Sequence, residues 1–174
     1  IEFDAYTNTN DNLSYFKRDT FIVDPNFKGQ TPIAAIRIFK NHGVDILGCY
    51  FSETDFVTST AIEVFAGSIK MKDHCTSISG TTCNGTLTRN TFIGFVQAID
   101  IYNTVMTSIP SKIDHVIIDQ HVLSGATTVL RDQMRGGIYI GKNFGSEIVN
   151  CTIKTLRKPT TTSSTPITYG LYLD

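Results

Sequence analysis

The chain has 174 residues, with 15 Lys and Arg residues against 16 Asp and Glu residues. This near balance of charge gives no field that would attract nucleic acid or an anionic lipid surface, so we expect neither partner. No apolar run approaches the ~18 to 20 residues that a membrane-spanning helix requires, and we expect no membrane insertion. The length suits a single domain, residues 1–174, that can bury a sizeable core.

In chain order, a strand-like piece at residues 1–12 precedes two short β-type motifs that alternate along the sequence. The first motif consists of a small residue, an aliphatic residue, any residue and a second aliphatic residue. Its copies lie at 35–38, 61–64, 98–101, 137–140 and 170–173. The second motif places a small polar residue or Cys two positions before an apolar residue. Its copies are Asp19-Thr20-Phe21, Cys49-Tyr50-Phe51, Asn90-Thr91-Phe92, Gln120-His121-Val122 and Cys151-Thr152-Ile153.

The second motif recurs after about 30 to 40 residues, a period typical of solenoids, because one unit cannot bury its apolar face alone. If the units stack in register, the period-2 rule directs alternate residues of each motif to the interior. The first motif then yields two inward rows, Ile36, Ile62, Ile99, Ile138, Leu171 and Ile38, Val64, Ile101, Ile140, Leu173. The second yields a polar row, Asp19, Cys49, Asn90, Gln120, Cys151, beside an apolar row, Phe21, Phe51, Phe92, Val122, Ile153. We interpret Asn90 and Gln120 as structural, because an inward amide at a corner can bond unpaired backbone groups.

Between the motifs we expect loop insertions of different lengths, at 66–85, 104–114, near 127–135 and at 158–166. The longest contains Cys75 and Cys83, which we expect to form a disulfide in an exported protein. Cys49 and Cys151 fall in one inward row but three units apart, too far to bond to each other. The sequence stops inside the last copy of the first motif, so we expect a segment of a longer chain or an end that another chain covers.

Two runs resemble the repeats of the right-handed parallel β-helix superfamily, the pectate-lyase-like solenoids. They are Asn-Thr-Phe-Ile-Gly-Phe-Val-Gln-Ala-Ile-Asp-Ile at 90–101 and Gly-Gly-Ile-Tyr-Ile at 136–140, which look like that family's N-x-F and G-I-x-I signatures. The resemblance implies an all-β right-handed parallel β-helix of about five coils with loop insertions. More narrowly, the sequence is similar to the β-helical segments of large secreted bacterial surface proteins, including substrates of type IX secretion. Because this fold supports many activities, the resemblance is specific for fold and weak for function.

The chemistry-bearing residues give few signals. The four histidines, His42, His74, His115 and His121, share no spacing, and no C-x-x-C pair or nearby His pair suggests zinc. Nucleophile-elbow, phosphate-loop and H-E-x-x-H patterns are absent from the sequence. We therefore expect no metal and no cofactor.

The outward row of the first motif contains Glu63 and Asp100, which would be stacked neighbours. Paired carboxylates on such a face can perform glycosidase acid/base chemistry or hold calcium, although Arg37 can neutralise Glu63. The next outward row contains Phe39, Phe65 and Tyr102. With Tyr139 of the carboxylate row, these aromatic side chains are candidates for a sugar platform, or they pack beneath the inserted loops.

We expect a secreted or cell-surface β-helix module with a structural or adhesive role and no active site of its own. Its partners would be glycans or other cell-surface or secretion proteins. The first alternative is a β-helix that binds or degrades polysaccharide with the Glu63, Asp100 and aromatic face. The second is a phage tailspike shaft, which would be trimeric.

Overall fold

The computed structural model describes residues 2–4, 14–23, 34–53, 60–95, 97–107, 110–119, 136–143, 145–154 and 169–173. Every regular element within these ranges is a β-strand, which confirms the all-β expectation. None of the described residues lies in a helix that could cross a membrane. The expected loops near 127–135 and at 158–166 lie outside the described residues.

Most of the described strands pair in three parallel sheets, here named A, B and C. Sheet A contains β1 (Glu2–Asp4), β4 (Ala34–Phe39), β7 (Thr60–Phe65), β14 (Gln97–Thr107), β17 (Gly136–Asn143) and β20 (Tyr169–Leu173). Sheet B contains β2 (Ser14–Lys17), β5 (Val44–Leu47), β8 (Ile69–Lys72), β15 (Lys112–Asp114) and β18 (Glu147–Val149). Sheet C contains β3 (Thr20–Val23), β6 (Tyr50–Glu53), β13 (Thr91–Ile93), β16 (Ile117–Asp119) and β19 (Thr152–Lys154).

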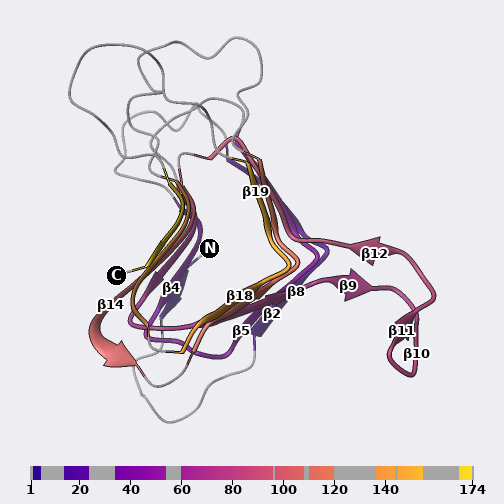
Figure 1. The fold of residues 1–174 in the computed structure, drawn as a ribbon, viewed down its shortest axis with the longest axis horizontal. Coiled ribbons are helices and arrows are strands. Elements are labelled where there is room, and N and C mark those ends of the chain that lie inside the picture. Colours follow the sequence, from indigo (N-terminus) through magenta and orange to yellow (C-terminus); the bar gives the residue numbers. More distant parts are fainter. Residues whose placement is uncertain are drawn as a thin grey trace.

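The described chain visits the sheets in the constant order A, B, C, and we call each set of three consecutive strands a unit. Every strand of a unit pairs in parallel with the corresponding strand of the neighbouring units. Figure 1 shows the three sheets as three sides around a common interior, with the strands of each side lying one behind another. Parallel sheets need such long connections between paired strands, and the other two sheets provide them.

Sheet A has the register that the first motif predicts. Ile62 is the neighbour of both Ile36 and Ile99, and the row continues through Ile138 to Leu171. The second aliphatic row, from Ile38 to Leu173, is aligned in the same way. Side chains of the inner units in these rows are almost fully buried, which explains why the motif repeats.

The small residue of the motif also has a structural reason. Ala61 and Ala98 belong to the buried core, directly before the aliphatic residue. At Gly137, an added Cβ would lie 2.5 Å from the carbonyl oxygen of Gly170 and 2.7 Å from a methyl group of Ile153. Two neighbouring segments therefore approach this position too closely for a larger side chain.

Sheet C confirms four of the five predicted copies of the second motif, and it corrects the copy that is fourth in chain order. Phe51 lies between Phe21 and Phe92 in register, but the next residue in the row is Ile118, followed by Ile153. The segment 116–118 therefore occupies the position that we predicted for Gln120-His121-Val122, which lies outside the described residues. The prediction was wrong because it required a polar first residue, whereas the apolar Val116 fills that place.

Sheet B was not predicted, and two expected insertions were misplaced as a result. Residues 69–72 of the expected 66–85 insertion form β8, and residues 112–114 of the expected 104–114 insertion form β15. Each of these strands is too short to display alternation clearly beside the longer strands of sheet A. Its inward row, however, is regular: Phe16, Ile46, Met71, Ile113, Ile148.

The remaining described strands form an arm at residues 73–89. They are β9 (His74–Cys75), β10 (Ile78–Ser79), β11 (Thr82–Cys83) and β12 (Leu87–Thr88), paired as two antiparallel ladders. Figure 1 shows the arm projecting from the corner between sheets B and C. The expected long insertion therefore exists, but it begins after β8 rather than at residue 66.

Candidate functional site

The outer face of sheet A carries the residues that the sequence singled out. Arg37, Glu63, Asp100, Tyr139 and Tyr172 follow one another in register along one row. Phe39, Phe65, Tyr102 and Gly141 form the parallel row two positions later. We call these two rows the sheet A face.

The carboxylate of Glu63 is engaged by its neighbour. Arg37 Nε donates to Glu63 Oε2 over 2.6 Å, and the two side chains are 43% and 40% exposed. Asp100 occupies the adjacent register position on the other side of Glu63. A glycosidase pair needs carboxyl groups that are open to the substrate, whereas Glu63 already binds Arg37. The arrangement therefore resembles an ordinary cross-strand ion pair more than an acid/base pair.

The aromatic row is stacked on itself. The rings of Phe39 and Phe65 are parallel within 3°, with centroids 5.1 Å apart. Tyr102 continues the row at 6.0 Å with a tilt of 30°, and Lys40 Nζ lies 5.0 Å from the centroid of Phe39. Because these ring faces are turned toward one another, mainly ring edges remain for solvent. A sugar that binds an aromatic platform needs an open ring face.

Tyr139 extends this pattern into the next units. Its ring is stacked on Tyr172, with centroids 5.4 Å apart and an angle of 9° between the planes. An added Cβ at Gly141 would lie 2.8 Å from the Tyr139 hydroxyl oxygen, so the tyrosine ring lies over this glycine. Tyr139 thus covers the position at which the aromatic row would otherwise have its next ring.

A second polar region lies at the corner between sheets B and C, and sequence reasoning missed it. In four units this corner has two residues, the first with a positive φ: Arg18 (57°), Gly48 (58°), His115 (53°) and Asn150 (54°). Non-glycine residues rarely adopt this conformation, although Asn and His are among those that do so more often. In the remaining unit the arm replaces the turn.

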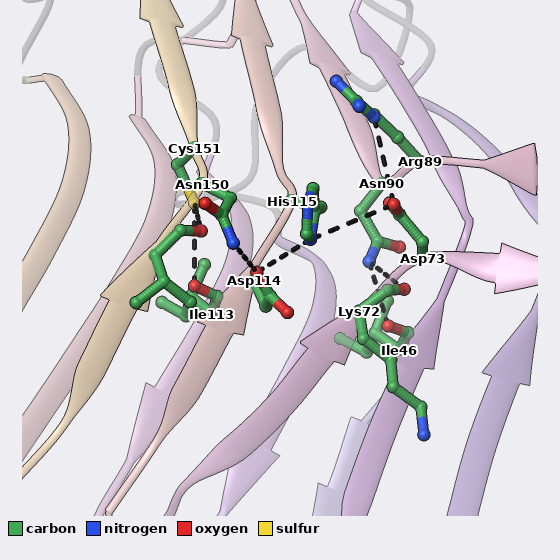
Figure 2. Close-up of polar contacts among 11 residues, drawn as sticks. Ile46, Lys72, Asp73, Arg89, Asn90, Ile113, Asp114, His115, Asn150 and Cys151 are labelled. Atoms are coloured by element: carbon green, nitrogen blue, oxygen red, sulfur yellow. Dashed lines mark hydrogen bonds and ion pairs between the residues drawn. The ribbon is translucent and has the colours of Figure 1, made fainter. Parts of the chain in front are cut away.

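Five side chains form a continuous polar chain along this corner, across three units (Figure 2). Arg89 Nε lies 3.9 Å from Asp73 Oδ2, which lies 4.0 Å from His115 Nδ1. His115 Nδ1 lies 2.8 Å from Asp114 Oδ1, and the same oxygen accepts a hydrogen bond of 3.1 Å from Asn150 Nδ2. Asp73 and Arg89 are the first and last residues of the arm and form its root. The polar side chains therefore connect the root of the arm to the next unit.

Asp73 is the least solvated member of this chain. Its side chain is 15% exposed, and its Oδ1 atom is buried without a hydrogen-bond partner among the described residues. Burial raises the pKa of Asp73 above its usual value, while the nearby charges of His115 and Arg89 lower it and that of Asp114 raises it. The carboxylate therefore depends on its cationic neighbours.

Asn90 follows directly after the arm and is completely buried. Its amide nitrogen donates to the carbonyl oxygens of Ile46 and Lys72, each over 3.0 Å, and its amide oxygen accepts from the backbone nitrogen of Cys49 over 2.8 Å. All of its partners are backbone groups at the corner (Figure 2). Asn90 is therefore a structural residue.

The arm itself is closed by a disulfide between Cys75 and Cys83, whose Cα atoms are 5.8 Å apart. Ile78 and Leu87 are 66% and 50% exposed on it. At its root, His74 and Thr88 pack onto Gly48 of the preceding unit: an added Cβ there would lie 2.7 Å from Thr88 O. The arm thus has a fixed base, a covalent brace and exposed apolar side chains.

The chemistry available to the described residues is limited. No group of three His, Cys, Asp or Glu side chains within them could hold a metal ion. Asp114 and His115 resemble two members of a catalytic triad, but no Ser, Thr or Cys of the described part bonds to the imidazole. Burial raises the pKa of both free cysteines, Cys49 and Cys151, which disfavours the reactive thiolate.

The corner had one weak signal in the sequence. A turn-prone or polar residue stands immediately before each true copy of the second motif, as in Arg18-Asp19, Gly48-Cys49 and Asn150-Cys151. The partners of Asp73, however, are 16 and 42 positions away along the chain, and only the register of two neighbouring units reveals them.

Comparison with protein families, with characterised proteins and with solved structures finds no significant match to this chain.

Proposed function

We propose that this chain is a right-handed parallel β-helix, similar to the pectate-lyase-like superfamily, that serves as a non-enzymatic structural or adhesive module. It would be part of a secreted or cell-surface protein, such as a substrate of type IX secretion. The constant A, B, C order of parallel strands supports a helical path of about five coils. The right-handed sense follows from the strong preference of parallel crossover connections.

The observation that carries the proposal is a disulfide-closed arm that projects from three sheets with a filled interior. The inner rows of sheets A, B and C fill the interior, and the ion pair and ring stacks on sheet A use the side chains that an active site would need. The arm, by contrast, presents Ile78 and Leu87 to solvent on a disulfide-closed support. A disulfide also suits an oxidising, extracellular environment.

The contact partners in this proposal are glycans or proteins of a cell surface, bound by the arm. A variant in which residues 73–89 are replaced by a single glycine would reproduce the Gly48-Cys49 corner before Asn90. We expect this variant to keep its β-type circular dichroism and to lose binding to arrays of cell-surface glycans and to immobilised cell-surface proteins. Unchanged binding by a folded variant, or no binding by the wild type, would argue against the adhesive role.

A second candidate function is binding or cleavage of polysaccharide along the sheet A face. The observations that favour it are the adjacent register of Glu63 and Asp100 and the 40% exposure of Tyr102. The wild type and a Glu63→Ala/Asp100→Ala variant should be incubated with neutral and acidic polysaccharides while new reducing ends and unsaturated uronates are measured. We expect no cleavage by either. Cleavage that disappears in the double variant would establish the enzymatic alternative.

Tyr102→Ala is the matched control for the binding experiment. If the arm is the contact surface, this variant binds like the wild type, whereas loss of binding would move the site to the sheet A face. A tailspike shaft would be trimeric, so light scattering separates it from the monomer that we expect.

A further inference from the structure

His115 lies between two carboxylates that belong to different units. Its Nδ1 atom is 2.8 Å from Asp114 Oδ1 and 4.0 Å from Asp73 Oδ2 (Figure 2). Asp73 is the first residue of the arm, whereas His115 and Asp114 belong to the corner of the next unit. The histidine is therefore placed so that its charge can act on the root of the arm.

The two contacts of His115 differ in what they require. A neutral imidazole with its proton on Nδ1 can still donate a hydrogen bond to Asp114 at 2.8 Å. Asp73, at 4.0 Å, is attracted chiefly by positive charge on the ring. Loss of the ring proton therefore leaves the bond to Asp114 in place and removes the attraction to Asp73.

We propose that the arm is held by a pH-sensitive anchor, in which protonated His115 attracts Asp73 and the arm root loosens when His115 becomes neutral. Histidine is the side chain that changes its charge between about pH 5 and pH 8. Asp73 responds strongly to this change because its Oδ1 is buried and accepts no hydrogen bond from the described residues. A poorly solvated carboxylate gains more from a nearby cation than an exposed one does.

The other charged groups at the root restrict the anchor to a window of pH. Arg89, 3.9 Å from Asp73, keeps its charge throughout, and Asp114 is a carboxylate that approaches the same ring nitrogen of His115. Because burial raises the pKa of Asp73, its negative charge is lost at a higher pH than for an exposed aspartate. Burial lowers the pKa of His74, beside Asp73 in the chain, and the charges of Lys17 and Arg18 lower it further. Protonation of Asp73 ends its attraction to His115 but also relieves its burial, whereas protonation of His74 opposes the folded root. The anchor should therefore act at intermediate pH, where Asp73 and His115 are both charged.

Amide hydrogen exchange of the arm root measures the anchor directly. The backbone nitrogen of Thr76 donates to Thr86 O, and that of Thr86 donates to the Thr76 hydroxyl. After correction for the intrinsic pH dependence of exchange, we expect these two amides to exchange about two to five times faster near pH 8 than near pH 6. The amides of Ile62 and Ile99 in sheet A should show no such change and serve as the internal reference.

Two variants isolate the charge of His115. His115→Asn keeps a residue type that tolerates the φ of 53° at this corner and removes the titratable ring. Asp73→Asn keeps the ring and removes the carboxylate. In both variants the difference between pH 6 and pH 8 should disappear, and the root should exchange at the faster rate at both pH values.

His42→Asn is the matched control, because His42 lies at the corner between sheets A and B and not at the corner that carries the arm. Its Nδ1 atom is 3.0 Å from Ser68 Oγ. It should retain the full pH dependence of the wild type. The proposal is overturned if the wild-type root exchanges equally fast at pH 6 and pH 8, or if the pH dependence survives in His115→Asn or Asp73→Asn. Neither result depends on whether the arm binds a partner.

Discussion

Two kinds of corner join sheets B and C, and their difference explains how this body carries an insertion. Four described units turn there within two residues, at Arg18-Asp19, Gly48-Cys49, His115-Val116 and Asn150-Cys151. The remaining unit inserts the arm at 73–89 and then resumes the same register, with Thr91 beside Tyr50 and Ile117. An insertion at a tight corner is tolerated because its two ends are already close together.

The arm corner differs from the plain corners in the side chain that bonds its backbone. At the second corner position the plain corners have Asp19, Cys49, Val116 or Cys151, whereas the arm corner has Asn90. The amide of Asn90 bonds the backbone groups of Cys49, Ile46 and Lys72. One side chain thus ties the arm corner to the preceding unit.

The largest effect should come from removing this amide. Asn90→Ala removes this partner from the buried backbone nitrogen of Cys49 and from the carbonyl oxygen of Ile46, while Lys72 O keeps its hydrogen bond from Gly48 N. We expect the free energy of unfolding to fall by about 3 kcal/mol. Urea denaturation followed by circular dichroism measures the loss. The matched substitution at a plain corner, Cys151→Ala, should lower it by less than about 1 kcal/mol. Equal losses at the two corners would show that the arm corner has no special requirement.

A smaller effect should separate the arm from the turn itself. Gly48 has a φ of 58°, and an added Cβ would lie 2.7 Å from Thr88 O and 2.8 Å from His74 Cβ, both in the arm. Gly48→Ala should lower the free energy of unfolding by about 2 to 3 kcal/mol in the wild type, from backbone strain and the contact together. In the variant with residues 73–89 replaced by glycine, only the strain of about 1 kcal/mol should remain.

Urea denaturation of the four proteins in this cycle gives the coupling between Gly48 and the arm. Additive losses would mean that the arm root does not press on Gly48. A positive coupling of about 1 kcal/mol or more would support the packing described above.

The sequence was sufficient for sheet A because the inward residues of β4, β7, β14, β17 and β20 are nearly identical, so the repeat is visible without any knowledge of contacts. It was insufficient for sheet B, whose inward row contains Phe16, Ile46 and Met71 and whose strands are only three or four residues long. It misplaced the fourth copy in sheet C because Val116 breaks the polar pattern. A buried position accepts different apolar side chains, whereas a search for a strict motif recognises only one pattern.

The candidate site divides in the same way. Glu63, Asp100 and the aromatic row could be placed on one face by alternation alone, but their engagement by Arg37 and by neighbouring rings required coordinates. The row of polar side chains from Arg89 to Asn150 could not be predicted from the sequence. It forms because the corners of three consecutive units lie next to one another, and the arm interrupts one of these corners.

The smallest effect should be the pH dependence contributed by His74, which exists only at the arm corner. Burial, followed by the charge of Lys17, lowers the pKa of His74 in the folded protein. In the unfolded chain this histidine has an ordinary pKa near 6.5, so the unfolded state binds the proton more readily than the folded state. The free energy of unfolding therefore falls as the pH drops below about 6.5, and the fall ends below the pKa of the folded state. Asp73 acts in the opposite direction in a more acidic range, because its raised pKa lets the folded state bind the proton first. Urea denaturation of the wild type and of His74→Gln between pH 5 and pH 7 tests the assignment. The wild type should lose stability toward pH 5 and the variant should lose less, whereas parallel curves would assign the acid sensitivity to another group.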